Sequence, residues 1–422
     1  MFLLLHLLIS SGLNGQWQHT APLANSEYVY CLTQTVVAQQ SSITYYQYAG
    51  TDKGVFISDN YGDSWTQFKN GLSTSDPSIL SIAAKGLEIY SGGYGGIYIS
   101  TNGGGHWTPI ADYSRGFIGA GVTSIAYNGA LLMAATSSSG FYITTDKGNS
   151  WQAMNNGFPS PPPWIYSLIT VNRSNVLYFY AATGNGVYVS PNNGTNWYKA
   201  GTGIPESTII NSICAMNNIF LAGTANGLYR SADWGATWGK VAGAPVYSFS
   251  SFVVYGKYIF GGTSYGVYIS SDGGNTWNSI TGNIPTNASN IMSVAVLGNY
   301  LLAGTYQGGV WRRPLAGLVS NEKKGIEIPS GYALEQNYPN PFNPSTEIRY
   351  SIPALGDNSG LQHVIIKVYD ILGREAARVV DEYQSPGVYS VRFNGGNLSS
   401  GIYFYILEAG KESFVKKMIL LK

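Results

Sequence analysis

The sequence predicts an all-β protein, a seven-bladed β-propeller followed by a small Ig-like β-sandwich. A short phrase ending in tryptophan occurs six times between residues 58 and 277, and its tryptophans lie 42, 44, 46, 41 and 39 residues apart. A fixed period of about 40–45 residues is typical of propellers. A second block, a glycine turn between two strands, occurs seven times, and both patterns stop after Pro314. Beyond residue 332, short alternating strands between turn clusters predict the sandwich.

Each repeat contains four predicted strands. The seven glycine-turn blocks begin near residues 48, 90, 133, 180, 221, 260 and 302. Each block has a strand, a tight glycine turn and a second strand of alternating large residues, which is the pattern of a β-hairpin. A further alternating strand comes before each block, as in residues 78–84 and 290–296. With a last strand after each tryptophan, one repeat predicts a four-stranded meander, and seven such units pack radially.

The tryptophan phrase is predicted to form a turn. It has Asp or Asn at its third position and glycine at its fifth. Short polar side chains accept backbone N–H groups in turns, glycine takes a positive φ, and a tryptophan ring can cover the space between blades. In the six copies, the Asp or Asn of the turn and the tryptophan that follows it are Asn60, Trp65, Asn102, Trp107, Asp146, Trp151, Asn192, Trp197, Asp233, Trp238, Asp272 and Trp277.

This phrase, S-x-[DN]-x-G-x-[ST]-W, resembles the Asp-box (BNR repeat) of sialidase-type and sortilin-type propellers. The resemblance implies that the turns are structural and lie on one face of the ring. Half of the six positions carry asparagine, which does not suit a row of catalytic or metal-binding carboxylates. We therefore expect no metal site in these turns.

The seventh hairpin, which ends near Arg313, has no tryptophan phrase after it. Propeller rings commonly close by borrowing a strand from the other end of the chain. The segment around Trp17 has the composition of an outer strand, and it lies just before the first blade. We therefore expect residues near Trp17 to complete the seventh blade.

Composition limits the compartment and the partners. Residues 1–15 form an apolar stretch followed by small residues, which predicts a secretory signal peptide. No later segment has the roughly 18 apolar residues of a membrane span. A net charge of +1 without runs of like charge disfavours a nucleic-acid partner. Cys31 and Cys214 fall in different repeats, so we interpret them as small buried residues rather than as a disulfide.

The chain changes character after the propeller, which we assign to residues 16–314. Residues 315–331 gain charge and lose aromatic periodicity, as a linker does. Residues 332–422 contain NYPNPFNPST (337–346), VYDILGRE (368–375), LSSGIYFY (398–405) and a basic, apolar end. These motifs resemble the type A C-terminal sorting domain of the type IX secretion system of Bacteroidetes. The resemblance implies binding to the type IX translocon through residues 332–422, and a protein that is secreted or held at the outer surface of a Gram-negative bacterium.

Ligand sites of propellers usually form on the face opposite the tryptophan turns, where the glycine turns and the connections between blades meet. The side chains there that suit ligand binding are aromatic or basic: Tyr94, Tyr113, Arg115, Trp164, Tyr265 and Tyr306. Three aspartates occupy adjacent loops of the same face: Asp52, Asp76 and Asp112. Glycoside hydrolysis uses two carboxylates about 5–9.5 Å apart, so two of these aspartates could form a catalytic pair.

The residue inventory favours binding over catalysis. The Arg-Ile-Pro signature of sialidases is absent, and the four histidines are scattered, so neither a zinc site nor a triad is indicated. No glycine loop suited to a phosphate cofactor occurs, and we expect no cofactor. The sequence therefore favours a non-catalytic propeller that binds an extracellular glycan or protein. The alternative is a glycoside hydrolase that acts through Asp52, Asp76 or Asp112.

Overall fold

The computed structural model describes residues 16–23, 26, 28–39, 42–111, 115–117, 121–127, 131–173, 176–319, 331–353, 362–384, 387–410 and 412–421. The expected signal peptide, residues 1–15, lies outside this part of the chain. The chain divides into two compact units, Met1–Leu315 and Ala316–Lys422. Over the described ranges, no helix has both the length and the apolar character needed to cross a membrane.

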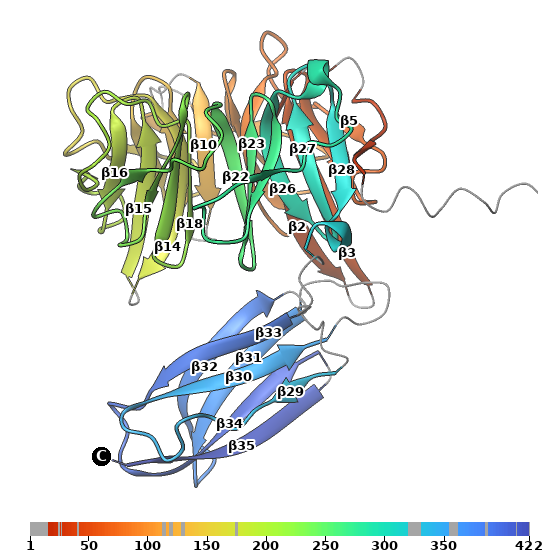
Figure 1. Ribbon diagram of the computed structural model, residues 1–422. Helices are drawn as coiled ribbons and strands as arrows, with labels where there is room; N and C mark the ends of the chain where they lie inside the picture. The colour runs from red at the N-terminus through yellow and green to blue at the C-terminus, as the bar shows by residue number, and fades with distance from the viewer. Residues whose placement is uncertain are drawn as a thin grey trace, which may run out of the picture. The chain divides into compact units, whose positions relative to one another are not determined.

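The first unit is a propeller of seven four-stranded antiparallel blades, counted over the described residues (Figure 1). Blades 1–3 contain β2 (Val29–Gln39), β3 (Ser42–Thr51), β4 (Gly54–Ser58), β5 (Thr66–Phe68); β6 (Ile79–Lys85), β7 (Glu88–Gly93), β8 (Gly96–Ser100), β9 (Thr108–Pro109); and β10 (Val122–Tyr127), β11 (Leu132–Thr136), β12 (Phe141–Thr144), β13 (Gln152–Ala153).

Blades 4–6 repeat the same order, and blade 7 takes its outer strand from the N-terminal segment. The strands are β14 (Ile165–Arg173), β15 (Val176–Thr183), β16 (Gly186–Ser190), β17 (Tyr198–Lys199); β18 (Ser212–Met216), β19 (Ile219–Thr224), β20 (Gly227–Ser231), β21 (Gly239–Lys240); β22 (Phe249–Tyr255), β23 (Tyr258–Thr263), β24 (Gly266–Ser270), β25 (Asn278–Ser279); and β26 (Ile291–Leu297), β27 (Tyr300–Thr305), β28 (Val310–Pro314), β1 (Gln18–His19). Short 3-10 turns η2 (Thr286–Ala288) and η3 (Leu315–Gly317) flank blade 7.

The first strand of each blade lies at the ring axis. These strands contact one another in sequence from β2 through β6, β10, β14, β18, β22 and β26, and β26 contacts β2 again. The cores lie between neighbouring blades. One such core joins Tyr48 of blade 1 to Ile79 and the fully buried Trp107 of blade 2. The predicted all-β propeller is therefore confirmed.

The expected closure of blade 7 is also confirmed. β1 pairs with β28, with Gln18 opposite Arg312 and His19 opposite Trp311. Trp17 is 2% exposed, and its indole Nε1 donates to the Ile280 carbonyl at 2.7 Å. Trp151 and Trp197 make the same kind of bond to the preceding blade. Trp17 therefore takes the place of a seventh tryptophan, contributed from the opposite end of the propeller sequence.

The two cysteines are free thiols, as the sequence indicated. Cys31 lies at an inner-strand position that carries serine in the other blades. Ser81 accepts the Ile125 N–H at 2.8 Å, and Ser293 accepts the Leu32 N–H at 3.0 Å, so these hydroxyls connect neighbouring inner strands. The Cys31 thiol likewise accepts backbone N–H groups, including that of Ile82, while burial raises its pKa to about 12.

The second unit is a sandwich of two antiparallel sheets, which agrees with the predicted Ig-like architecture. One sheet has the order β29 (Ala333–Leu334), β30 (Ser345–Ile352), β33 (Gly387–Asn394), and the other has the order β32 (Glu375–Gln384), β31 (Gln362–Asp370), β34 (Gly401–Ala409), β35 (Glu412–Leu420). Their facing side chains form one core that includes Ile348, Ile366 and Tyr405. The buried Asn337 fixes the segment before β30, because its N–H donates to the Tyr405 hydroxyl at 2.8 Å.

Candidate functional site

In each of the six tryptophan turns, the Ser or Thr at the first position and the Asp or Asn at the third position bond within the turn. In the first turn, the Asn60 Oδ1 accepts the Ser64 N–H at 3.0 Å and the Ser58 hydroxyl at 2.9 Å. The Ser58 oxygen in turn accepts the Gly62 N–H at 2.9 Å. The other five turns repeat these three bonds. The Asp or Asn side chain is thus occupied in shaping its own loop.

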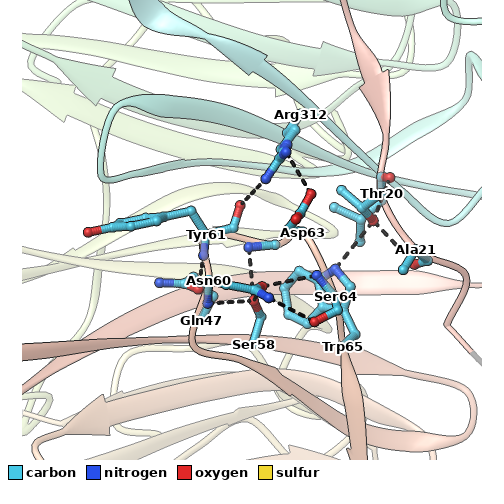
Figure 2. A network of polar contacts seen from close by, with 12 residues as sticks. Thr20, Ala21, Gln47, Ser58, Asn60, Tyr61, Asp63, Ser64, Trp65 and Arg312 are labelled. Carbon is cyan, nitrogen blue, oxygen red and sulfur yellow. Dashed lines mark hydrogen bonds and ion pairs between the residues drawn. The ribbon is translucent and has the colours of Figure 1, made fainter. Parts of the chain in front are cut away.

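The first turn also fastens the closure of the ring, as Figure 2 shows. The Arg312 Nη2 of blade 7 lies 2.7 Å from the Asp63 Oδ1. The Asp63 carbonyl accepts the Ala21 N–H at 3.2 Å, and the Trp65 Nε1 donates to the Thr20 hydroxyl at 3.3 Å. One tryptophan turn therefore contacts both the last strand and the N-terminal segment.

The three aspartate turns differ from the Asn60 turn in the direction of one hydrogen bond. Asn60 Nδ2 donates to the Ser64 hydroxyl, whereas the Asp146 carboxylate accepts from the Ser150 hydroxyl at 2.6 Å. Asp233 and Asp272 accept from threonine hydroxyls at 2.6 and 2.7 Å. Donation from Ser150 and then Thr144 holds the pKa of Asp146 at about 2. Thr237 and Ser231 hold that of Asp233 at about 2. For Asp272, burial opposes the shift, but the donors prevail and lower its pKa.

The opposite side, here called the connector face, is formed by the turns between second and third strands and by the connections between blades. Among the described propeller residues, nine large hydrophobic side chains are exposed, and six of them lie on this face: Tyr94, Trp164, Ile209, Val246, Tyr265 and Tyr306. Tyr94 is 59% exposed and Tyr265 is 62% exposed. Exposed apolar side chains that gather on one face indicate an interaction surface.

A tyrosine cluster joins blades 7 and 1 on the connector face. The Tyr28 ring lies 4.8 Å from that of Tyr306 and 5.8 Å from that of Tyr30, measured between centroids. Burial raises the pKa of Tyr30 to about 12, and the charges of Asp52 and nearby Tyr94 add to the shift. Tyr94 belongs to the second-to-third-strand turn of blade 2. The cluster therefore extends toward that blade.

Tyr28 and Tyr30 were not predicted from the sequence as site residues. They flank Val29, and the alternation of this segment is typical of an ordinary buried strand. The register of β2 shifts between Val29 and Cys31, so Tyr30 lies in a β-bulge, where a side chain is re-aimed. Five other inner strands show the same shift. An internal alignment on the Ser or Cys position would have marked the residue before it as a separate, variable position.

The carboxylates of the connector face help to fix its backbone. The Asp52 Oδ1 accepts the Ser26 hydroxyl at 2.8 Å and the Tyr28 N–H at 3.1 Å, and its Oδ2 lies 3.0 Å from the Lys53 ammonium. The Asp76 Oδ1 accepts the Ser78 N–H at 3.0 Å, which is a common role of turn aspartates. The predicted residues Asp112 and Tyr113 lie outside the described part of the chain.

The remaining predicted residues fall into separate groups. The ring centroids of Trp164 and Tyr166 lie 6.2 Å apart, and those of Tyr265 and Tyr247 lie 4.5 Å apart, so Trp164 and Tyr265 each belong to an aromatic pair. The Arg115 Nη1 donates to the carbonyl of Pro109 in the outer strand β9 at 2.8 Å. Among the described residues, no group of three or more His, Cys, Asp or Glu side chains could hold a metal ion. The described part of the connector face thus offers three aromatic groups: the tyrosine cluster, the Trp164–Tyr166 pair and the Tyr247–Tyr265 pair.

Comparison with known families matches residues 16–163 and 166–312 to the DUF6242 beta propeller domain. The chain belongs to this family. Residues 336–421 match the secretion system C-terminal sorting domain. The family member described here is therefore exported by the type IX secretion system, to the cell surface or into the medium. No curated protein matches the chain. The Asp-box resemblance of its turns stays a prediction.

Solved structures support the fold. The extracellular domain of a putative one-component system of B. thetaiotaomicron is 16% identical, with a TM-score of 0.58 over 82% of this chain, which spans only 46% of that domain's length. YCF48 bound to a D1 peptide is 15% identical, with a TM-score of 0.53 over 71% of this chain and 94% of that one. PorZ, a surface component of the type IX secretion system of Porphyromonas gingivalis, is 14% identical, with a TM-score of 0.51 over 95% of this chain and 61% of the PorZ chain. These identities show a shared fold alone.

Proposed function

We propose that this exported propeller is a non-catalytic protein that binds a neutral extracellular glycan on its connector face. The observation that carries the proposal is the concentration of exposed aromatic side chains on that face. Aromatic rings with a polar tip offer a flat apolar surface together with a hydrogen-bonding group. Such rings suit a sugar, which has apolar C–H faces and many hydroxyls.

The charges of the face favour a neutral ligand. Asp52 is paired with Lys53, and the Arg115 guanidinium bonds to a backbone carbonyl. Charged residues make up only 11% of the whole chain. Recognition of an anionic polymer would need a basic surface, which this composition does not supply. The aromatic groups come from different blades, so an extended polysaccharide could contact more than one of them.

The test is a binding screen of the full exported chain against neutral polysaccharides, combined with an assay for released reducing ends. We expect binding without turnover. The variant Tyr94→Ala/Tyr265→Ala/Tyr306→Ala should bind at least about tenfold more weakly, because three contacts of about 0.5–1.5 kcal/mol each are lost. Tyr198→Ala is the matched control, since Tyr198 is 56% exposed but belongs to the outer strand β17. Unchanged affinity in the triple variant would overturn the proposal.

One observation favours the glycoside hydrolase alternative. Asp52 and Asp76 both lie close enough to Tyr30 for their negative charges to raise its pKa, so the two carboxylates belong to one region of the connector face. A hydrolase would release reducing ends, and Asp76→Asn would abolish that release while leaving the fold intact. This result would replace the binding function with catalysis. Binding to a protein in place of every polysaccharide tested would keep the connector face as the site and change the ligand class.

A further inference from the structure

The C-terminal unit presents two different outer faces. On the three-stranded sheet, the outward side chains are polar and include Glu347, Arg349 and Arg392, all exposed. The Arg349 Nε lies 3.2 Å from the Glu347 carboxylate, which also accepts the Ser390 hydroxyl. An antiparallel sheet with one solvated face normally alternates in this way.

The outer face of the four-stranded sheet carries several exposed apolar side chains instead. Ile402 and Phe404 in β34 and Val415 in β35 are 44%, 37% and 58% exposed, whereas the alternate residues Tyr403 and Tyr405 are buried. Cross-strand neighbours continue the surface: Ile402 faces Ile419, Ile406 faces Val415, and Phe404 faces Tyr369 of β31. Apolar side chains from three strands therefore lie on this face, together with Lys417, which faces Phe404, and Lys367, which faces Ile406 and lies 3.8 Å from the Glu408 carboxylate.

The turn after β31 extends this surface. Ile371 and Leu372 are 70% and 71% exposed, and they follow Asp370, which pairs with Tyr403 beside Ile402. Seven large hydrophobic side chains are exposed among the described residues of this unit. Five of them form what we call the sorting patch: Ile371, Leu372, Ile402, Phe404 and Val415.

Charged residues border the sorting patch. On β32, Arg378 lies 3.4 Å from Glu375 and 2.7 Å from Asp381. On β35, the exposed Lys417 pairs with Phe404 across the strands. An apolar centre with a charged rim is the usual anatomy of a protein–protein interface. A patch of this kind on an exported domain marks an interaction site rather than an ordinary solvated face.

We propose that the sorting patch is the surface through which this domain binds a protein of the type IX export machinery. The match of residues 336–421 to a secretion sorting domain supplies the occupant, because such a domain must present a surface that the machinery can bind. The patch fits a partner with an apolar groove, which Phe404 and Leu372 enter, and a carboxylate that meets Lys417. This assignment is independent of what the propeller binds.

The test uses the full chain in a type IX-competent host and measures the fraction that reaches the cell surface or the medium. The patch variant Ile402→Thr/Phe404→Thr/Val415→Thr keeps residues that suit a strand. We expect its exported fraction to fall at least about tenfold, since loss of buried anchors costs more than the 1.4 kcal/mol that corresponds to a tenfold change. The control Glu347→Thr/Arg349→Thr/Arg392→Thr, on the opposite sheet, should be exported within about twofold of the wild type. Wild-type export of the patch variant would overturn the proposal.

A second measurement separates recognition from folding. The purified patch variant should melt within about 2 °C of the wild type, because surface substitutions usually change stability by less than about 0.5 kcal/mol. A large fall in melting temperature together with lost export would mean that these side chains support the fold, and it would overturn the proposal. Lys417→Glu leaves the apolar surface intact, and we expect it to reduce export several-fold. Unchanged export would exclude an acidic partner surface.

Discussion

The two faces of the propeller use the same kinds of side chain in opposite ways. On the face of the tryptophan turns, Asn60 and Asp146 bond within their own loops, and Trp107 is 1% exposed. On the connector face, Trp164 is 55% exposed, and its ring centroid lies 6.2 Å from that of Tyr166. The repeated residues thus support the fold, while the residues that break the repeat remain available for a ligand. The following experiments separate these two roles.

The largest expected effect comes from two tryptophans given the same substitution. Trp17→Ala removes a buried ring that closes the seventh blade, and a buried Trp→Ala change costs about 3–5 kcal/mol. We expect the melting temperature to fall by about 5–15 °C, measured by circular dichroism. Trp164→Ala should leave the melting temperature within about 2 °C of the wild type and weaken ligand binding. Equal melting temperatures for the two variants would remove the distinction between the faces.

A smaller effect is expected at Cys31, where the repeat normally carries serine. Cys31→Val removes the acceptor for the Ile82 N–H and leaves that donor unsatisfied, which costs about 1–3 kcal/mol. Cys31→Ser retains an acceptor and should stay within about 1 kcal/mol of the wild type in denaturant unfolding. If serine destabilises as much as valine, the bond between inner strands is not what the position requires.

The smallest effect concerns acid stability. The pKa values of Asp146 and Asp233 are depressed to about 2, so their ionised forms stabilise the fold above the unfolded-state pKa of 3.8. That contribution is lost as the pH falls toward about 2. In Asp146→Asn/Asp233→Asn/Asp272→Asn, the three turns become like those of blades 1, 2 and 4. Between about pH 4 and pH 2, the melting temperature of this variant should fall less steeply than that of the wild type. Parallel curves would contradict the depressed pKa values.

The fold could be predicted from the sequence because the residues that form each blade occur again in every repeat. Seven glycine-turn blocks and six tryptophan turns each report the same local chemistry, and the missing seventh turn identified Trp17. The site was less predictable, because the residues that form it differ from one blade to the next. Tyr94, Trp164, Tyr265 and Tyr306 were found by their place in exposed turns. Tyr28 and Tyr30 were missed, since alternation along a strand does not reveal a bulge.

The pairing of β1 with β28 brings the beginning and the end of the propeller sequence into one sheet. In a ring of equivalent units, the point at which the chain enters is therefore a matter of connectivity rather than of architecture. Domains whose termini lie close together tolerate circular permutation. A permuted propeller would join the two ends of the propeller sequence by a short linker and begin at Gly86, where an added Cβ would meet nothing within 4 Å. We expect it to form the same seven blades in a different sequence order.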